Sequence, residues 1–348
     1  MSGRVYLDWN ASAPLRPEAR AAMLAALDVA GNPSAIHAEG RAARALVERA
    51  RAQVATAMGA EAADVVFVSG ATEAAALACA GRGLVCAPVE HEAVLAWCDA
   101  SLGIDARGGV VVADPSVTAL QAANSETGVV QDLPQRLALV DATQAFGKIP
   151  FAFDWSGADM AMVSAHKIGG PKGVGALVIR RGLDVAARIR GGGQEMGRRS
   201  GTENVAAIAG FGAAAAAAAR DLDAGVWNDV AGRRNAFEAH LADHAEGLIC
   251  VGQDAARLPN TSCLVTPGWK GETQVMQMDL AGFAVSAGSA CSSGKLRGSG
   301  TLAAMGFDET AAGSALRVSI GPDTSDEDLA RLADTWLAAR QKYRARAA

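Results

Sequence analysis

Short apolar runs alternate with longer alanine-rich segments through the first part of the chain. Each short run ends in polar residues, which is typical of a strand followed by a turn. Strands are predicted at 64–68, 137–141, 159–163 and 175–181. Helices are predicted at 17–28, 38–58 and 203–222. This alternation predicts an α/β domain with a mainly parallel sheet.

Beyond about residue 223 the pattern changes. A long helix is predicted at 226–246, followed by short strand-like runs at 261–265 and 315–321. Thr324 and Glu327 have the spacing of a capping box and open a final helix with one apolar face. We therefore predict a second, smaller α+β domain. The predicted boundaries are 13–222 for the large domain, and 1–12 with 223–348 for the small domain.

Composition narrows the possible classes of protein. The chain has 348 residues and a net charge of −5, with no block of basic residues, which argues against a nucleic-acid partner. Residues 1–14 lack the apolar core of a secretory signal. The run at 205–219, between Glu203 and Arg220, is too short and too weakly apolar for a bilayer and predicts a core helix. We expect a cytoplasmic protein without a membrane partner.

The cysteines and histidines give little sign of disulfides or metal. The cysteines lie at 79, 86, 98, 250, 263 and 291. None forms a CxxC pair, which fits a reducing compartment. Cys79, Cys98 and Cys263 lie in apolar surroundings and are interpreted as packed thiols. His240 and His244 could grip a metal from one helix, but no third ligand is near, so we predict no metal site.

Polar residues follow several of the predicted strands. The carboxyl ends of parallel strands meet at one edge of a sheet, so these residues should gather there. SGATE (69–73) is either an ordinary helix cap or an anion cradle formed by N–H groups and the Thr72 hydroxyl. Asp141 is either a helix cap or the partner of a cation. Lys167, in SAHKIGGPKG, is either on a surface turn or a nucleophile.

Together these residues describe a site for pyridoxal phosphate. The amine of Lys167 can form a Schiff base with the cofactor, and Asp141 can keep the pyridine nitrogen protonated. The lysine must be neutral when it attacks, and a partly desolvated site favours that state. His91, in VEHEAV, is either a packed histidine or one that stacks on the ring and moves protons.

The chain resembles the NifS/IscS-like cysteine desulfurases, which are class V enzymes of fold-type I that depend on pyridoxal phosphate. The matching segments occur in the family's order and span nearly the whole chain. They are YLDWNASAP (6–14), GNPSAIH (31–37), SGATE (69–73), EHEAV (90–94), NSETGVVQD (124–132), VDATQAFGK (140–148), SAHKIGGPKGVGAL (164–177), GGGQEMGRRSGTEN (191–204), SAGSACSSG (286–294) and LRVSIG (316–321). The resemblance implies a large domain with a seven-stranded, mainly parallel sheet between helices.

The resemblance also implies a role for each matching residue. Lys167 forms the Schiff base, Asp141 pairs with the pyridine nitrogen and His91 stacks on the ring. Asn124 and Gln144 hydrogen-bond the ring hydroxyl. The phosphate is held by Ala71, Thr72, Ser164 and His166, and by Thr202 from the neighbouring subunit of a homodimer. Arg317 clamps the carboxylate of L-cysteine in a pocket that Asn10 and Ala11 line.

Cys291 lies in SAGSACSSGKLRGSGT, where apolar packing is unfavourable. It is either a linker cysteine or, as the resemblance implies, the residue on a mobile loop that takes sulfur from L-cysteine as a persulfide and leaves L-alanine. The acceptor of that sulfur is not named by the sequence; an iron–sulfur cluster scaffold or a thiolation enzyme are the alternatives.

Three departures from the family pattern leave other readings open. The segments 92–123 and 132–139 are short, so we expect one crossover helix to be missing, and the chain ends soon after its last helix. Other reactions on the same fold remain possible: an aminotransferase, a selenocysteine lyase or a C–S lyase. A third reading is a non-catalytic protein that handles sulfur or acts as a scaffold.

Overall fold

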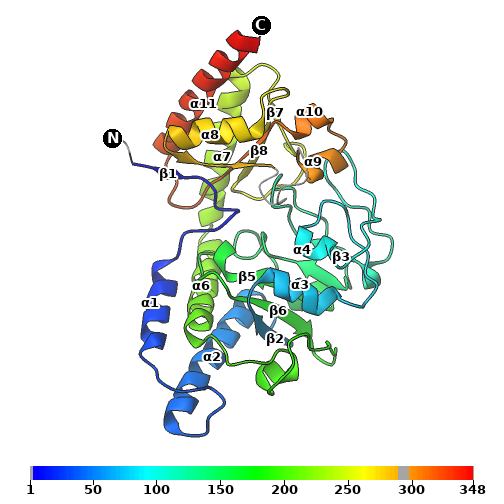
Figure 1. Ribbon diagram of the computed structural model, residues 1–348, viewed down its shortest axis with the longest axis vertical. Helices are drawn as coiled ribbons and strands as arrows, with labels where there is room; N and C mark the ends of the chain where they lie inside the picture. The colour runs from blue at the N-terminus through cyan, green and yellow to red at the C-terminus, as the bar shows by residue number, and fades with distance from the viewer. Residues whose placement is uncertain (1–2, 289–297, 348) are drawn as a thin grey trace.

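The computed structural model describes residues 3–288 and 298–347. Figure 1 shows two parts, one above the other, with the C-terminal helix at the top and the first long helices at the bottom. The lower part is built on a five-stranded sheet and the upper part on a four-stranded sheet, beside a separate two-stranded pair.

The strand order of the five-stranded sheet is β2-β6-β5-β4-β3, and β6 is its one antiparallel strand. Its strands are β2 (Ala63–Val68), β3 (Ala119–Gln121), β4 (Leu139–Asp141), β5 (Met160–Ser164) and β6 (Gly175–Arg180). Past β3, Val85 forms a parallel bridge with Thr118, and Asp99 one with Val85. The sheet therefore has seven positions, as predicted, but two of them are isolated bridges.

Both faces of this sheet are buried, which explains the continuous apolar runs of its strands. Along β2, Val65 and Phe67 belong to one core cluster while Val66 and Val68 belong to another, as the period of two requires. The first cluster includes side chains of α1 (Pro17–Leu27), α2 (Ala38–Ala57) and α6 (Val205–Asp223). The second includes side chains of α3 (Ala71–Cys79) and the short α4 (Glu92–Leu95).

Helix α6 is long and apolar enough to cross a membrane by length and composition alone. Its alanines instead fill the core between the sheet and α2. A Cβ added at Gly212 would lie 2.6 Å from the Cα of Ala50. Helices α6 and α2 therefore approach each other more closely than a side chain at position 212 would allow. The helix is thus packed inside the protein, as the sequence predicts.

The second part has a core of its own. Its four-stranded sheet has the order β10-β11-β8-β7. The strands of this part are β1 (Val5–Tyr6), β7 (Ile249–Cys250), β8 (Thr261–Val265), β9 (Phe283–Ala284), β10 (Ser286–Ala287) and β11 (Ala315–Ser319). Its helices are α7 (Val226–His244), α8 (Gly271–Leu280), α9 (Gly300–Ala304), α10 (Glu309–Ala312) and α11 (Asp326–Ala347). Val5 and Leu7 pack with Trp269 and Trp336, so the N-terminal strand joins this core. The domain boundaries stay a prediction. Leu258, which falls in the predicted small domain, packs into the core of the first part.

The structure corrects the cap of the last helix. The predicted pair was Thr324 and Glu327, but the reciprocal bonds are made one residue later. Ser325 Oγ accepts the N–H of Asp328 at 3.1 Å, and Asp328 Oδ2 accepts the N–H of Ser325 at 3.3 Å. Thr324 Oγ1 instead accepts the N–H of Gly321 at 3.0 Å. The shorter aspartate takes the place that a glutamate usually fills.

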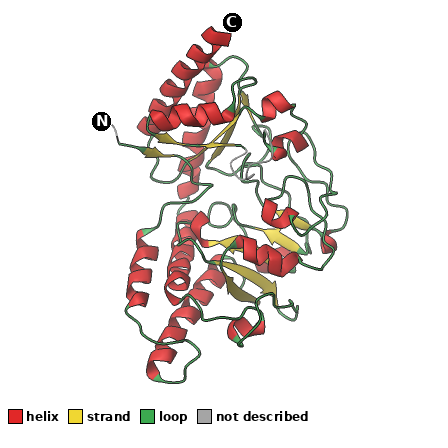
Figure 2. Ribbon diagram, in the orientation of Figure 1, coloured by secondary structure: helices red, strands yellow, loops and turns green. Residues whose placement is uncertain are grey.

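The missing crossover helix is confirmed within the described residues. The connection from β3 to β4, residues 122–138, contains no helix. Figure 2 shows loops on this side of the molecule, beside β3. Gln131 joins two of them: its Nε2 donates to Gly108 O at 2.8 Å, and its Oε1 accepts the N–H of Val110 at 2.9 Å. Val110 and Leu133 pack on the core, so loop side chains help to cover the sheet here.

Candidate active site

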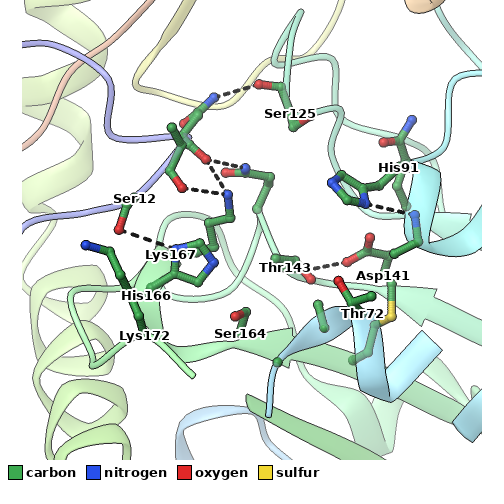
Figure 3. A pocket seen from close by; sticks show the side chains of 18 of the residues that line it. Ser12, Thr72, His91, Ser125, Asp141, Thr143, Ser164, His166, Lys167 and Lys172 are labelled. Atoms are coloured by element: carbon green, nitrogen blue, oxygen red, sulfur yellow. Dashed lines mark hydrogen bonds between the residues drawn. The ribbon is translucent and has the colours of Figure 1, made fainter. Parts of the chain in front are cut away.

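A cavity of about 590 Å³ lies between the two parts, beside the carboxyl ends of β4 and β5. That size suits a cofactor or a small ligand. Figure 3 shows side chains converging on it from several elements. Its lining includes residues of the N-terminal segment (10–12), of the start of α3 (70–72), of the turns after β4 (141–144) and β5 (164–167), and of β11 (Arg317).

Lys167 ends the short turn after β5 and points into the cavity. Its Nζ donates to the main-chain oxygens of Asn10 at 2.6 Å and Ala11 at 3.0 Å. The amine is therefore partly buried and held against the N-terminal segment. This placement excludes the alternative of a lysine on a surface turn.

Asp141 ends β4 and lies on the opposite side of the cavity, beneath His91 in Figure 3. Burial raises the pKa of its carboxyl, although Thr143 opposes this by hydrogen bonding. The N–H of Thr143 donates to Asp141 Oδ1 at 2.9 Å. A buried carboxylate of this kind is stabilised by a cation that enters the cavity.

Glu90 is a second buried carboxyl on the Asp141 side, and the sequence analysis missed it. Burial raises its pKa well above the usual value, and the charge of Asp141 raises it further. Its Oε1 accepts the N–H of Gln121 at 2.9 Å, while its buried Oε2 has no partner in the described part of the chain. Burial therefore favours the neutral form of Glu90. The sequence signal was an acidic residue directly before His91.

The start of α3 forms an anion cradle. Ala71 and Thr72 lie in the first turn, where main-chain N–H groups lack partners within the helix. Ser164 lies beside this turn, because a Cβ added at Gly70 would be 3.7 Å from its Oγ. Gly175 allows the close approach: a Cβ there would lie 2.8 Å from the Cα of Gly70.

His166 and His91 differ in their hydrogen-bond partners. Burial, together with the neighbouring Lys167, lowers the pKa of His166 to about 4, so this ring is neutral, and its Nδ1 lies 3.3 Å from Ser12 Oγ. His91 caps α4, where its Nδ1 accepts the N–H of Ala93 at 3.0 Å. A neutral His91 ring must therefore carry its proton on Nε2.

Asn10 connects the N-terminal segment to both parts of the molecule. Its Nδ2 donates to Thr261 Oγ1 at 2.8 Å and to Ser125 O at 3.1 Å. Its Oδ1 accepts from Asn260 Nδ2 at 3.0 Å, and its main-chain oxygen accepts from Gln144 Nε2 at 3.0 Å. These bonds fix Asn10, whose main-chain oxygen is one of the two acceptors of Lys167.

Arg317 enters the cavity from β11. Its Nη2 donates to Asp8 Oδ1 at 2.9 Å and its Nη1 to Ser125 O at 3.0 Å. Its buried Nε has no partner in the described residues. Glu126, also missed from the sequence, lies nearby, and burial raises its pKa to about 7.

Two of the predicted site residues, Asn124 and Thr202, are not in the lining of the cavity. Asn124 does not line the cavity: its Oδ1 accepts the N–H groups of Glu126 and Thr127, and its Nδ2 donates to Val89 O. Thr202 is exposed and lies just before Asn204, the residue that caps α6. Cys291 lies outside the described residues.

The comparisons with known proteins agree with one another. The family model for aminotransferase class-V matches residues 5–332. A cysteine desulfurase from Cereibacter sphaeroides is 38% identical over 366 residues, which cover 94% of each chain. The cysteine desulfurase IscS of Dictyoglomus turgidum is 35% identical, over 94% of this chain and 92% of its own. A solved NifS-like protein from Rickettsia africae ESF-5 superimposes with a TM-score of 0.88 at 28% identity, over 97% of this chain and 99% of that one.

Proposed function

The chain belongs to the aminotransferase class-V family and is a cysteine desulfurase, and on that premise we propose how its residues perform the reaction. We propose that it binds pyridoxal phosphate through Lys167, converts L-cysteine to L-alanine and takes the sulfur onto Cys291. The observation that carries the proposal is that Lys167 and Asp141 face the same cavity, each from the end of one of two neighbouring strands.

The donors and acceptors of the cavity fit this cofactor. The cradle at Ala71 and Thr72 suits a phosphate, and the buried Asp141 suits a protonated ring nitrogen. Lys167 faces Thr72 and Asp141 from the other side of the cavity in Figure 3, at a wall where its amine can reach an aldehyde. When bound, pyridoxal phosphate supplies an electron sink for charge that develops on the substrate.

The other residues of the site bind and orient. Arg317, held by Asp8 and Ser125, offers its buried guanidinium to the substrate carboxylate. His91, whose Nδ1 is occupied by Ala93, donates a proton through Nε2. Lys167, once neutral, can accept a proton from the substrate Cα.

Sulfur transfer is assigned to Cys291 from the sequence. In the described chain, the strand that precedes this stretch lies beside Arg317, because Ser286 pairs with Arg317 and Ala287 with Leu316. The Cys291 thiolate attacks the substrate sulfur, so an S–S bond forms as the Cβ–S bond breaks. The electron pair of the broken bond stays with the carbon fragment, which gains protons to become alanine.

Assembly and location complete the proposal. We propose a two-fold homodimer in which Thr202 of one subunit reaches the phosphate of the other; the exposure of Thr202 and its absence from the lining of its own cavity support this. A cytoplasmic location is supported by five cysteines that are free among the described residues. The sulfur acceptor is proposed to be another protein, either an iron–sulfur scaffold or a thiolation enzyme.

The test is the fate of L-cysteine with the unsubstituted protein and with Cys291→Ser. The unsubstituted protein should release alanine and carry one extra sulfur on Cys291, detected by peptide mass. Cys291→Ser should still bind cysteine, with a spectral change, yet form almost no alanine. Substitution of Cys250, in the second core, is the matched control and should keep turnover. If Cys291→Ser keeps most of its alanine formation, a lyase without sulfur relay becomes the better assignment.

A further inference from the structure

Lys148 is a buried lysine behind the cavity. Its exposed fraction is 2%, and it has no ion pair among the described salt bridges. It does not line the cavity itself. An ammonium in such a place is costly unless it serves some purpose, since burial favours the neutral amine.

The charges around Lys148 make this cost larger. Burial, together with the positive charges of Lys167 and Arg317, lowers its pKa to about 7. Asp8, a carboxylate on this side, is engaged by Arg317. His166 faces the same group of cations and is neutral. The fold therefore keeps an amine where a methionine would avoid the electrostatic penalty.

The contacts of Lys148 explain what the amine does. Its Nζ donates to Gln144 Oε1 at 2.8 Å and lies 3.4 Å from Asn10 Oδ1. An amine on lysine offers donors to a side-chain carbonyl, so the Gln144 amide must turn its oxygen toward Lys148. Its Nε2 then faces the opposite way and donates to Asn10 O at 3.0 Å.

Asn10 O is also an acceptor for Lys167, at 2.6 Å. The chain Lys148, Gln144, Asn10 and Lys167 is thus one hydrogen-bonded network, of which Lys148 is the buried end. If the Gln144 amide were reversed, its oxygen would face Asn10 O. The hydrogen bond between Gln144 and Asn10 would then be replaced by repulsion between two oxygen atoms.

We propose that Lys148 is a positioning residue, which fixes the Gln144 amide so that its NH₂ group, and not its oxygen, is presented to the cavity and to Asn10. This inference rests on the proposed function, because the group that receives the Gln144 donor is the ring hydroxyl of pyridoxal phosphate. Lys148 itself touches neither cofactor nor substrate.

A double-mutant cycle on cofactor binding tests this. Apoprotein is titrated with pyridoxal phosphate, and both the dissociation constant and the near-visible band are recorded for Lys148→Met, Gln144→Leu and the double variant. We expect each single substitution to weaken binding by about five- to tenfold and to shift the band. The double variant should be no weaker than Gln144→Leu, because both changes remove the same donor.

Two further variants exclude a merely structural role. Gln144→Glu keeps an oxygen acceptor for Lys148 but has no NH₂ group, so it should weaken cofactor binding in an apoprotein whose circular dichroism shows that it is folded. Lys342→Met is the matched control, because it removes an exposed lysine of α11 that is not in the lining of the cavity; combined with Gln144→Leu, it should leave binding as it is in Gln144→Leu alone.

Several outcomes would overturn the inference. Unchanged binding in Lys148→Met, or multiplying effects in its double variant, would show that Lys148 does not act through Gln144. If Lys148→Met does not fold and Gln144→Glu binds normally, Lys148 serves the fold alone. If the unsubstituted apoprotein takes up no pyridoxal phosphate at all, the proposed function fails instead.

Discussion

The cavity has two unlike walls. In Figure 3, Lys167, His166 and Lys172 lie on one side, while Asp141 and His91 lie on the other. Burial acts on both in opposite senses: it lowers the pKa of Lys148 and His166, and raises that of Asp141 and Glu90. Burial therefore favours the neutral form of the titratable groups on each side. The charged form of each group is stabilised when a ligand group of opposite charge binds beside it.

This difference gives the cavity a direction. An anionic group is favoured at the start of α3 and near the cations, while a cationic ring nitrogen is favoured at Asp141. A ligand that carries both groups fits in one orientation only. The predictions below perturb one wall at a time and run from the largest expected effect to the smallest.

Replacing Lys167 removes the nucleophile of the cationic wall. Lys167→Ala should lower the rate of alanine formation by at least about 10³-fold, because covalent attachment of the cofactor is lost. The protein should still bind pyridoxal phosphate loosely, and borohydride should no longer fix it. Lys342→Ala on α11 is the control and should leave turnover unchanged; if Lys167→Ala retains even a tenth of the activity, Lys167 is not the nucleophile.

Replacing Asp141 neutralises the other wall without changing its shape. Asp141→Asn should lower turnover by about 10²-fold, since the ring nitrogen loses the partner that keeps it protonated. The rate of alanine formation at saturating cysteine measures this. Asp159→Asn, which removes an ion pair with the surface residue Arg180, should change turnover less than twofold. Equal effects from the two substitutions would contradict the assignment of Asp141.

Two buried groups near the cavity, Glu126 and Lys148, should also give opposite pH dependence to the stability of the apoprotein. The pKa of Glu126 is about 7 in the folded protein, so between the usual carboxyl value and pH 7 the folded state holds a proton that the unfolded state has lost. Its contribution to stability therefore falls as pH rises through that window.

Lys148 behaves in the reverse sense. Its folded pKa is about 7, so from there to the usual lysine value the unfolded state binds the extra proton, and stability rises with pH. Chemical denaturation from pH 5 to 10 should show a flatter acidic limb in Glu126→Gln and a flatter basic limb in Lys148→Met. Parallel curves for all three proteins would mean that these groups titrate normally.

Glu90 should give the smallest effect. Because burial favours the neutral form of its carboxyl, Glu90→Gln replaces one hydrogen-bonding group by another of similar shape, and turnover should change less than about twofold. Steady-state alanine formation measures it. A large loss in Glu90→Gln would show instead that the site uses an ionised Glu90.

The sequence analysis identified the site residues whose roles are indicated by their neighbours along the chain. It missed those whose properties arise from burial in the folded protein. Lys167 and Asp141 follow apolar runs, so their places at strand ends could be read directly, and the parallel topology brought them to one cavity. Glu90, Glu126 and Lys148 look like ordinary charged residues along the chain. Their altered pKa values arise from the tertiary structure, which the pattern of hydrophobic and polar residues along the chain does not show.

The secondary structure was also predicted in large part from the sequence. The buried strands and the helices at 17–28, 38–58 and 203–222 agree with the structure to within about two residues. The cap at Ser325 was misplaced by one position, because threonine and serine stand side by side and a glutamate fitted the usual pattern. Asn124 was assigned to the ring hydroxyl from the resemblance, but its side chain is engaged in the loop after β3.

The most direct test of the account is where the cofactor is attached. The purified protein, loaded with pyridoxal phosphate, is reduced with borohydride and digested, and the labelled peptide is identified by mass. The account predicts a label on Lys167 and none on Lys148 or Lys172, which lie behind and beside it. A label on either of those lysines, or no label on a protein that still makes alanine, would contradict the central claim.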